Sequence, residues 1–304
     1  MTEQLRLTPR GWVMILILAL VWAGSFTANR GALETVGVYT TVAIRVTGGA
    51  FVLWVWVALR RQSIPREWKY IPIFFLHGLL NNALPFSLIV WGQQYIDSGL
   101  ASILNATTAL FTVILASLFF ADERLSLNRL IGVIIGFLGV VIVIGVEDIT
   151  ALGSGPTALG EWAILAATLS YAVSAILSRK TLKGLSPEVA SAGMLSGAGV
   201  IMGILALTTE DISNMTFNTQ AIISVAYLAI LSSAFAYILF FKVLNTAGAG
   251  NLSLVTLLVT PFAIILGALF FGEALEWNAY LGFIVLAFGL AVLDGRLPIG
   301  KTRL

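Results

Sequence analysis

A stretch of about 25 residues occurs twice in this chain, 150 positions apart. The first copy, residues 119–143, reads FFADERLSLNRLIGVIIGFLGVVIV, and the second copy, residues 270–293, reads FFGEALEWNAYLGFIVLAFGLAVL. Identical residues meet at this offset: Glu123 and Glu273, Leu125 and Leu275, Asn128 and Asn278, Gly132 and Gly282, Gly139 and Gly289. The chain must therefore fold into two related halves, each ending in a similar apolar segment.

The composition indicates a membrane protein. Of the 304 residues 59% are hydrophobic and 11% are charged, whereas a soluble domain carries about 25% charged residues. Cysteine is absent, which excludes disulfides, thiolate metal sites and a cysteine nucleophile. The formal net charge of +2, with its basic residues dispersed between apolar runs, gives no reason to expect a nucleic-acid partner.

Ten apolar runs are long enough to cross a bilayer, because a spanning helix needs about 20 mostly apolar residues. They cover approximately residues 11–31, 39–60, 70–94, 98–121, 128–146, 160–180, 187–207, 219–242, 249–271 and 275–294. The first run follows two arginines, as a signal peptide would, but its length and its repeat partner favour a retained helix. We therefore predict an all-α polytopic membrane protein with ten transmembrane helices.

Each half, residues 1–150 and residues 151–304, contains five of these runs. Because five is odd, the second half enters the membrane in the opposite direction, and a pseudo-two-fold axis in the membrane plane relates the halves. Such inverted repeats place a substrate near the midplane between the halves and permit alternating access.

The basic residues predict the orientation. With a cytoplasmic N-terminus, all 17 lysines and arginines except Arg30 and Arg45 lie at the cytoplasmic ends of the runs, as the positive-inside rule requires. The opposite loops are acidic and carry Glu34, Asp97, Glu147, Asp148, Glu210 and Asp211. We expect both termini on the cytoplasmic side.

Residues 21–26 (VWAGSF), residues 45–50 (RVTGGA) and the turns at Glu123 and Glu273, each followed by a glycine-bearing run, resemble the EamA-type branch of the drug/metabolite transporter superfamily. The resemblance covers nearly the whole chain and implies a ten-helix secondary transporter without a cofactor. More narrowly, overall similarity and His77-Gly78 resemble the YddG-type bacterial exporters of aromatic amino acids, which implies an inner-membrane location. The second half departs from the first, since Met194 occupies the place of Arg45.

Aromatic residues give the first candidates for a binding site. Most tryptophans lie near the ends of the runs, as the interfacial aromatic belt requires. Trp22 and Tyr171 lie instead near the centres of symmetry-related runs, at an offset of 149. We predict that they form the aromatic walls of a midplane cavity; the alternative is that they fill the core or face lipid.

Polar residues inside the runs give further candidates. His77, the only histidine, either titrates during transport or is a neutral imidazole that bonds a neighbouring helix. Asn81 and Asn82 need partners inside a membrane, and Pro85 frees a backbone carbonyl that could bind substrate or water. The alternative is hydrogen bonding that only holds helices together.

Arg45 admits two interpretations. It attracts a substrate carboxylate, or, as we favour, its side chain reaches outward or pairs with a helix end near Glu34 or Asp97. The predicted substrate-binding set, all within the runs, is Trp22, Ser25, His77, Asn81, Asn82, Pro85, Asn105, Thr108, Tyr171, Ser174, Tyr237, Thr260 and Pro261. No catalytic residue and no metal ligand is predicted.

The sequence favours a secondary transporter of small molecules over other functions. It holds no G-x-x-x-x-G-K-[ST] phosphate loop, so we expect no ATP hydrolysis. An intramembrane enzyme would need clustered His, Asp or Glu, and a channel would need a filter loop or charge rings. The resemblance implies export of amino acids, particularly aromatic ones, with a broad drug or sugar-nucleotide carrier as the alternative. The glycines at 132, 136, 139, 282 and 289 predict close helix contact, and a homodimer through these helices is possible.

Overall fold

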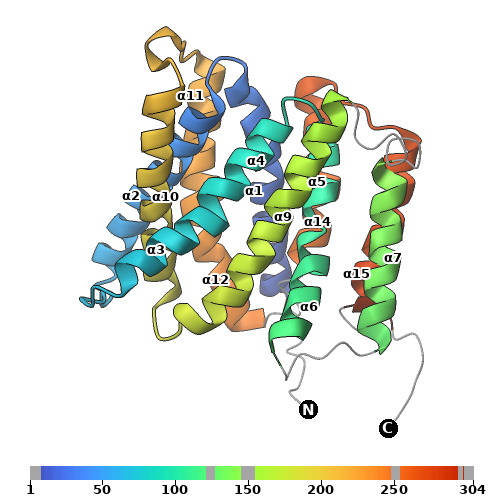
Figure 1. Ribbon diagram of the computed structural model, residues 1–304, viewed down its shortest axis with the longest axis horizontal. Coiled ribbons are helices and arrows are strands. Elements are labelled where there is room, and N and C mark those ends of the chain that lie inside the picture. Colours follow the sequence, from blue (N-terminus) through green and yellow to red (C-terminus); the bar gives the residue numbers. More distant parts are fainter. Residues whose placement is uncertain (1–7, 121–126, 145–154, 248–253, 294–296, 298–304) are drawn as a thin grey trace.

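The computed structural model describes residues 8–120, 127–144, 155–247, 254–293 and 297. Within these ranges the protein consists of helices and short loops, with no strand, so the predicted all-α class is confirmed (Figure 1). The turn that contains Glu123 and the loop that contains Glu147 and Asp148 lie outside the described residues.

Seven helical segments are long and apolar enough to cross a membrane. Four of these segments are continuous helices, two in each half: α1 (Pro9–Leu33), α2 (Val38–Leu59), α9 (Pro156–Thr181) and α10 (Pro187–Thr209). The other segments are composite: α3 (Tyr70–Gly78), η1 (Leu79–Ala83) and α4 (Leu84–Gly92); α5 (Ser98–Asn105) and α6 (Thr108–Phe119); α11 (Thr219–Ala226), η4 (Tyr227–Phe235) and α12 (Ala236–Ala247).

Three further apolar helices of the described chain offer shorter apolar stretches: α7 (Leu127–Ile144), α14 (Leu254–Phe271) and α15 (Trp277–Leu293). The protein is therefore a multi-pass membrane protein.

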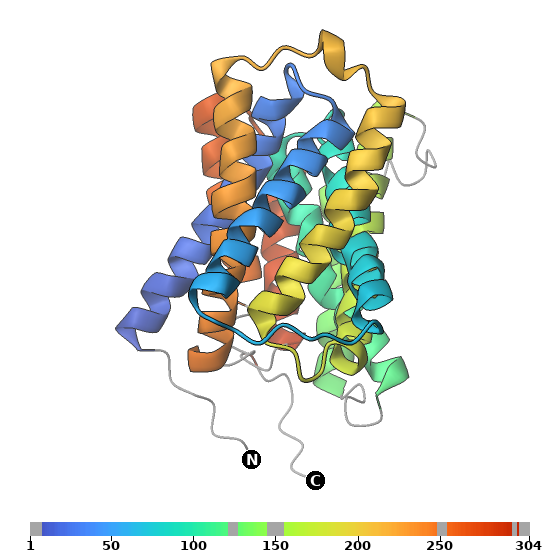
Figure 2. The same cartoon turned by 90° about the vertical axis from the view of Figure 1, so that its left-hand side faces the viewer.

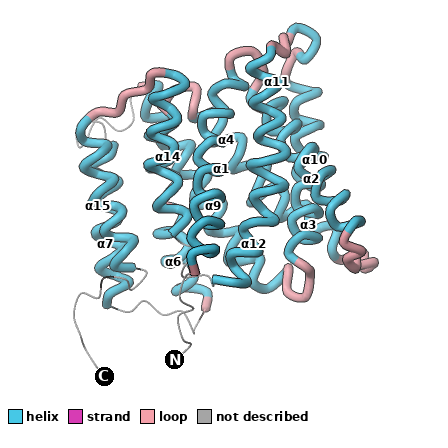
Figure 3. The backbone as a smooth tube through the Cα atoms, turned by 180° about the vertical axis from the view of Figure 1, so that it is seen from behind, coloured by secondary structure: helices cyan, strands magenta, loops and turns pink. Residues whose placement is uncertain are grey.

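Helices from the two halves of the chain pack against each other. α2 packs against α10, α1 against α14, and α7 against α15. Figure 2 shows α2 beside α10, and Figure 3 shows α7 beside α15 at one edge of the bundle. The interior of the bundle is consequently built from both halves.

The helix ends form two chemically different ends of the bundle. One end, which we call the acidic end, holds the loops with Glu34, Asp97, Glu210 and Glu273 and lies uppermost in Figure 1. The other, the basic end, holds the loops at residues 60–69 and 182–186, with Arg60, Arg61, Arg66, Lys69 and Lys183.

Glycines bring α7 and α15 into close contact, as predicted. A Cβ atom on Gly139 would lie 2.8 Å from the Gly282 carbonyl oxygen, and one on Gly282 would lie 2.7 Å from the Gly139 carbonyl oxygen. Small residues allow membrane helices to approach this closely. These glycines are used within one chain, and the homodimer through α7 and α15 stays a prediction.

Two π-helical turns interrupt long helices at related positions. η1 covers residues 79–83, and adding the repeat offset of 150 gives residues 229–233, which lie inside η4 at residues 227–235. A π turn holds an additional residue in the helix and is often found at functional sites.

Candidate functional site

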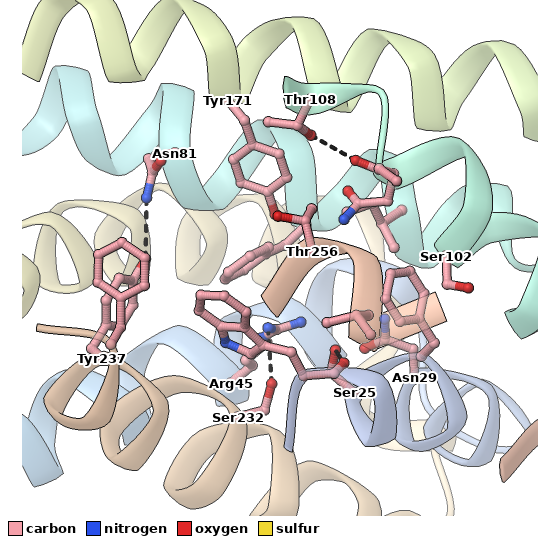
Figure 4. A pocket seen from close by; sticks show the side chains of 18 of the residues that line it. Ser25, Asn29, Arg45, Asn81, Ser102, Thr108, Tyr171, Ser232, Tyr237 and Thr256 are labelled. Carbon is pink, nitrogen blue, oxygen red and sulfur yellow. Dashed lines mark hydrogen bonds between the residues drawn. The ribbon is translucent and has the colours of Figure 1, made fainter. Parts of the chain in front are cut away.

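A cavity of about 370 Å³ lies inside the bundle, between helices of both halves. Ligand pockets usually measure about 300–1,000 Å³, so the cavity is large enough for a small molecule. Figure 4 shows its walls, to which α1, α2, η1, α4, α5 and α6 contribute from the first half and α9, η4, α12 and α14 from the second.

A second hollow of about 740 Å³ lies between α1, α11 and α14. Its walls include Ile223 and Phe270, which are 63% and 70% exposed, so it opens on the outer, lipid-facing surface of the bundle. The central cavity has convergent polar groups and aromatic walls, and we take it as the candidate site.

The structure brings seven of the thirteen predicted residues together. Those that line the cavity are Trp22, Ser25, Asn81, Asn105, Thr108, Tyr171 and Tyr237. Those placed outside its lining are His77, Asn82, Pro85, Ser174, Thr260 and Pro261.

Paired aromatic rings form two parts of the cavity wall. Trp22 of α1 lies 5.7 Å from Phe240 of α12, and Tyr171 of α9 lies 6.4 Å from Phe86 of α4, measured between ring centroids. All four side chains line the cavity. These flat apolar surfaces suit a planar apolar group of a ligand.

Arg45 differs from the interpretation that we favoured from the sequence. Its side chain stays inside the bundle and the residue is only 6% exposed. Nε donates to the Ser233 hydroxyl at 3.3 Å and Nη2 to the Ser232 hydroxyl at 3.2 Å, while Cζ lies 3.7 Å from the centre of the Phe86 ring. Arg45 stays inward because η4 supplies two hydroxyl acceptors and α4 supplies an aromatic face.

Tyr237 connects the two asparagines of η1. The Asn81 amide donates to the Tyr237 hydroxyl at 3.1 Å, and that hydroxyl donates to the Asn82 side-chain oxygen at 3.1 Å. Asn81 and Tyr237 line the cavity, whereas Asn82 lies behind them and is fully buried. One tyrosine from the second half thus fixes both amides of the first half.

His77 and Ser174 are hydrogen-bonded to each other outside the cavity. The His77 ring places Nδ1 3.1 Å from the Ser174 hydroxyl and Nε2 2.7 Å from the Thr181 hydroxyl, both on α9. The geometry matches the sequence-based alternative in which His77 joins neighbouring helices.

Pro85 does not leave a carbonyl open to the cavity. In the π turn, residue 84 donates its N–H to the carbonyl five residues earlier, at Leu79. Pro85 has no N–H for the next carbonyl, that of Leu80, and the Ser170 hydroxyl donates to it instead at 2.7 Å. The Thr260 hydroxyl likewise bonds a backbone carbonyl, that of Ser102, at 3.3 Å.

A hydrogen-bond network links the cavity lining to the loops of the acidic end. The Asn29 amide donates to the Gln93 side-chain oxygen at 2.9 Å, and the Gln93 amide donates to Ser98 Oγ at 3.3 Å. The Ser98 hydroxyl and backbone N–H both donate to Glu273, each at 2.9 Å. Arg30 lies 3.3 Å from Asp97 and 3.8 Å from Glu273.

Thirteen lining residues lie outside the predicted set. Arg45 is one of them, although the sequence offered it as a carboxylate-binding residue. The thirteen are Phe26, Asn29, Arg45, Phe86, Ile89, Ser102, Ala106, Thr112, Ala175, Ser232, Phe240, Thr256 and Val259. For two of the others, Asn29 and Ser232, the sequence held a signal that could have identified them. Asn29 lies one helical turn after Ser25, and Ser232 is the repeat mate of Asn82 at the 150-residue offset. Phe86 and Phe240 had none, because 18 phenylalanines are spread through the apolar runs.

Comparisons with known proteins agree with this architecture. The sequence profile of the EamA-like transporter family matches residues 9–145 and again residues 158–293. A solved crystal structure has the same fold, with a TM-score of 0.66, 15% identity, and coverage of 93% of this chain and 96% of that chain.

Curated relatives match over nearly their whole length. The uncharacterized transporter YoaV of Bacillus subtilis is 23% identical over 277 residues, which are 91% of this chain and 94% of that protein. A probable terminal-alkyne amino-acid exporter of Streptantibioticus cattleyicolor is 25% identical over 306 aligned positions, covering 98% of this chain and 97% of that protein. Because the family profile covers most of the chain in two successive matches, this protein belongs to the EamA-like transporter family.

Proposed function

We propose that this transporter exports amino acids, mainly aromatic ones, across a bacterial inner membrane by alternating access, as a YddG-type exporter would. The observation that carries the proposal is the cavity between the two halves, with Trp22 and Phe240 on one side and Tyr171 and Phe86 on another. The relative named as a probable terminal-alkyne amino-acid exporter supports amino acids as the substrate class.

Residues 1–150 and 151–304 would then be two inverted repeats of five transmembrane helices each. The double match to the family profile supports this division. The π turns η1 and η4, at equivalent positions of the two halves, support it independently. Counting α7, α14 and α15 as spans gives the predicted ten helices.

The N-terminus would lie in the cytoplasm, with the basic end facing inward. The charges at the two ends support this orientation through the positive-inside rule. In the loop before α11, hydrogen bonds from Ser213 and Asn214 lower the pKa of Asp211, so this part of the acidic end keeps its negative charge.

Transport into proteoliposomes tests the proposal. We expect saturable uptake and counterflow of L-tryptophan and L-phenylalanine, measured with and without an imposed pH gradient. Ohmic flux would indicate a channel, product formation an enzyme, and preferential uptake of drugs or sugar nucleotides the alternative carrier. If purified, monodisperse protein carried neither aromatic amino acid, the aromatic assignment would be wrong.

A pair of tryptophan variants tests the cavity itself. Trp22→Ala removes a cavity wall and should raise the KM for L-tryptophan about three- to tenfold, the value of an aromatic pair. Trp277→Ala is the matched control, because Trp277 is 79% exposed at the start of α15, and should leave the KM unchanged. Equal effects of the two substitutions would remove Trp22 from the site.

A further inference from the structure

We infer that Arg45 binds the carboxylate of the substrate, so that the cavity accepts anions and zwitterions and rejects cations. The inference rests on the proposed function and adds to it the residue that sets the substrate's charge.

The positive charge of Arg45 has no acidic partner among the residues that the structure describes. Among the described residues no carboxylate lies within salt-bridge distance, and the guanidinium contacts two serine hydroxyls and the Phe86 ring. A buried cation without a counter-ion is costly, and a ring face compensates for only part of that cost. An anion in the cavity would supply the missing charge.

The serines orient the guanidinium without neutralising it. Ser233 and Ser232 accept from Nε and Nη2, whereas Nη1 makes no hydrogen bond to a described residue. The side chain lines the cavity, as Figure 4 shows. The planar guanidinium matches the geometry of a carboxylate better than an ammonium group would.

The rest of the cavity is neutral. Among its described lining residues Arg45 is the only charged one, so an ammonium group would meet no carboxylate there. It would meet the neutral side chains of Asn29 and Asn105 instead, whose buried oxygens accept no hydrogen bond from another described residue.

The hydrogen bonds of Gln93 explain why the side-chain oxygen of Asn29 is left without a donor. Gln93 donates its amide to the Phe26 carbonyl at 2.9 Å, so its own side-chain oxygen must accept the Asn29 amide, and the Asn29 oxygen is left over. Neutral oxygens bind an ammonium group less strongly than a carboxylate does. The substrate's carboxylate should therefore matter more than its amino group.

Competition with L-tryptophan uptake tests this asymmetry on the wild-type protein. Indole-3-propionate lacks the amino group and tryptamine lacks the carboxylate. We expect indole-3-propionate to inhibit within about tenfold of unlabelled L-tryptophan, and tryptamine to inhibit about a hundredfold more weakly or not at all. If tryptamine inhibited as well as indole-3-propionate, the inference would be overturned.

Substitutions of Arg45 test whether this residue binds the carboxylate. Arg45→Lys keeps the charge but loses the planar fork and should raise the KM for L-tryptophan about tenfold, while Arg45→Gln should abolish saturable uptake. Lys242→Gln removes one positive charge from an exposed position on α12 and should leave the KM unchanged. Wild-type KM values in folded Arg45→Lys and Arg45→Gln proteins would contradict the assignment.

Failure of the inference and failure of the proposed function give different results. If the wild-type protein carried no aromatic amino acid, the proposed function would fail. Thermal unfolding of the purified wild-type protein would still test Arg45: stabilisation by indole-3-propionate and not by tryptamine supports anion binding. Stabilisation by tryptamine alone, or by neither probe, overturns it.

Discussion

At the scale of single residues, His77 shows how an ionisable group is held in this bundle. Its two ring nitrogens face the hydroxyls of Ser174 and Thr181, which lie two helical turns apart on α9. A hydroxyl both donates and accepts, so each nitrogen of a neutral imidazole finds a partner. The residue is fully buried and does not line the cavity.

Replacing His77 should therefore affect stability more than transport. His77→Ala leaves two hydroxyls without their partner and should lower the free energy of unfolding by about 1–3 kcal/mol. Thermal unfolding in detergent measures this, and His77→Gln, which retains a donor and an acceptor, should lose less.

The pH profile of transport is the second measurement on the same variants. We expect His77→Ala and the wild type to show the same pH dependence, because His77 lies outside the cavity. A profile that loses a titration near neutral pH in His77→Ala would give His77 a direct part in coupling.

Individual side chains also show why part of the site could not be predicted. Trp22 and Tyr171 could be predicted, because their positions at the centres of two spans are a local property of the sequence. The inward direction of the Arg45 side chain could not be predicted, since it depends on Ser232 and Ser233, which lie 187 and 188 positions away in the chain.

At the scale of elements, two helices receive their N-terminal caps from distant loops. Glu210 accepts from the Tyr39 and Thr40 N–H groups of α2, each at 2.8 Å. Glu273 accepts from the Ser98 N–H of α5 at 2.9 Å. The residues directly before these helices provide no side-chain cap. A carboxylate satisfies unpaired N–H groups there and interacts favourably with the positive end of the helix.

Removing the Glu273 cap should weaken the acidic end. Glu273→Ala should lower the free energy of unfolding by about 1–3 kcal/mol, because it leaves buried donors on Ser98 without an acceptor. Hydrogen exchange should show faster exchange at the Ser98 and Gly99 amides. Glu276→Gln, at an exposed position in the same loop, is the control and should change neither quantity. Unchanged exchange in Glu273→Ala would show that this end is closed by other contacts.

At the scale of the whole molecule, the apolar runs predicted the helices well because length and hydropathy are local properties. The contact between α7 and α15 was also foreseeable, since glycine spacing marks a close helix contact without naming the partner. The interruptions of the composite helices could not be predicted. A π turn, or the break between Asn105 and Thr108, leaves each run apolar and continuous in the sequence.

The orientation in the membrane is testable because the chain has no cysteine. Ser213→Cys places a thiol at the acidic end, and Lys183→Cys places one at the basic end, both at exposed positions. A membrane-impermeant maleimide should label Ser213→Cys in intact cells and Lys183→Cys only after permeabilisation. The reverse pattern would invert the proposed topology.

The π turns also bear on the history of the chain. Each one accommodates a residue beyond the α-helical count, as an insertion into an older helix would. η1 and η4 occupy equivalent positions in both halves, because the offset is 149 residues at Trp22 and Tyr171 and 150 at Glu123 and Glu273, and either value moves residues 79–83 into residues 227–235. If residues 1–150 and 151–304 are two copies of one ancestral unit, as proposed, a single insertion explains both turns, whereas two separate insertions would have had to occur at the same place. On that proposal, the extra residue predates the duplication.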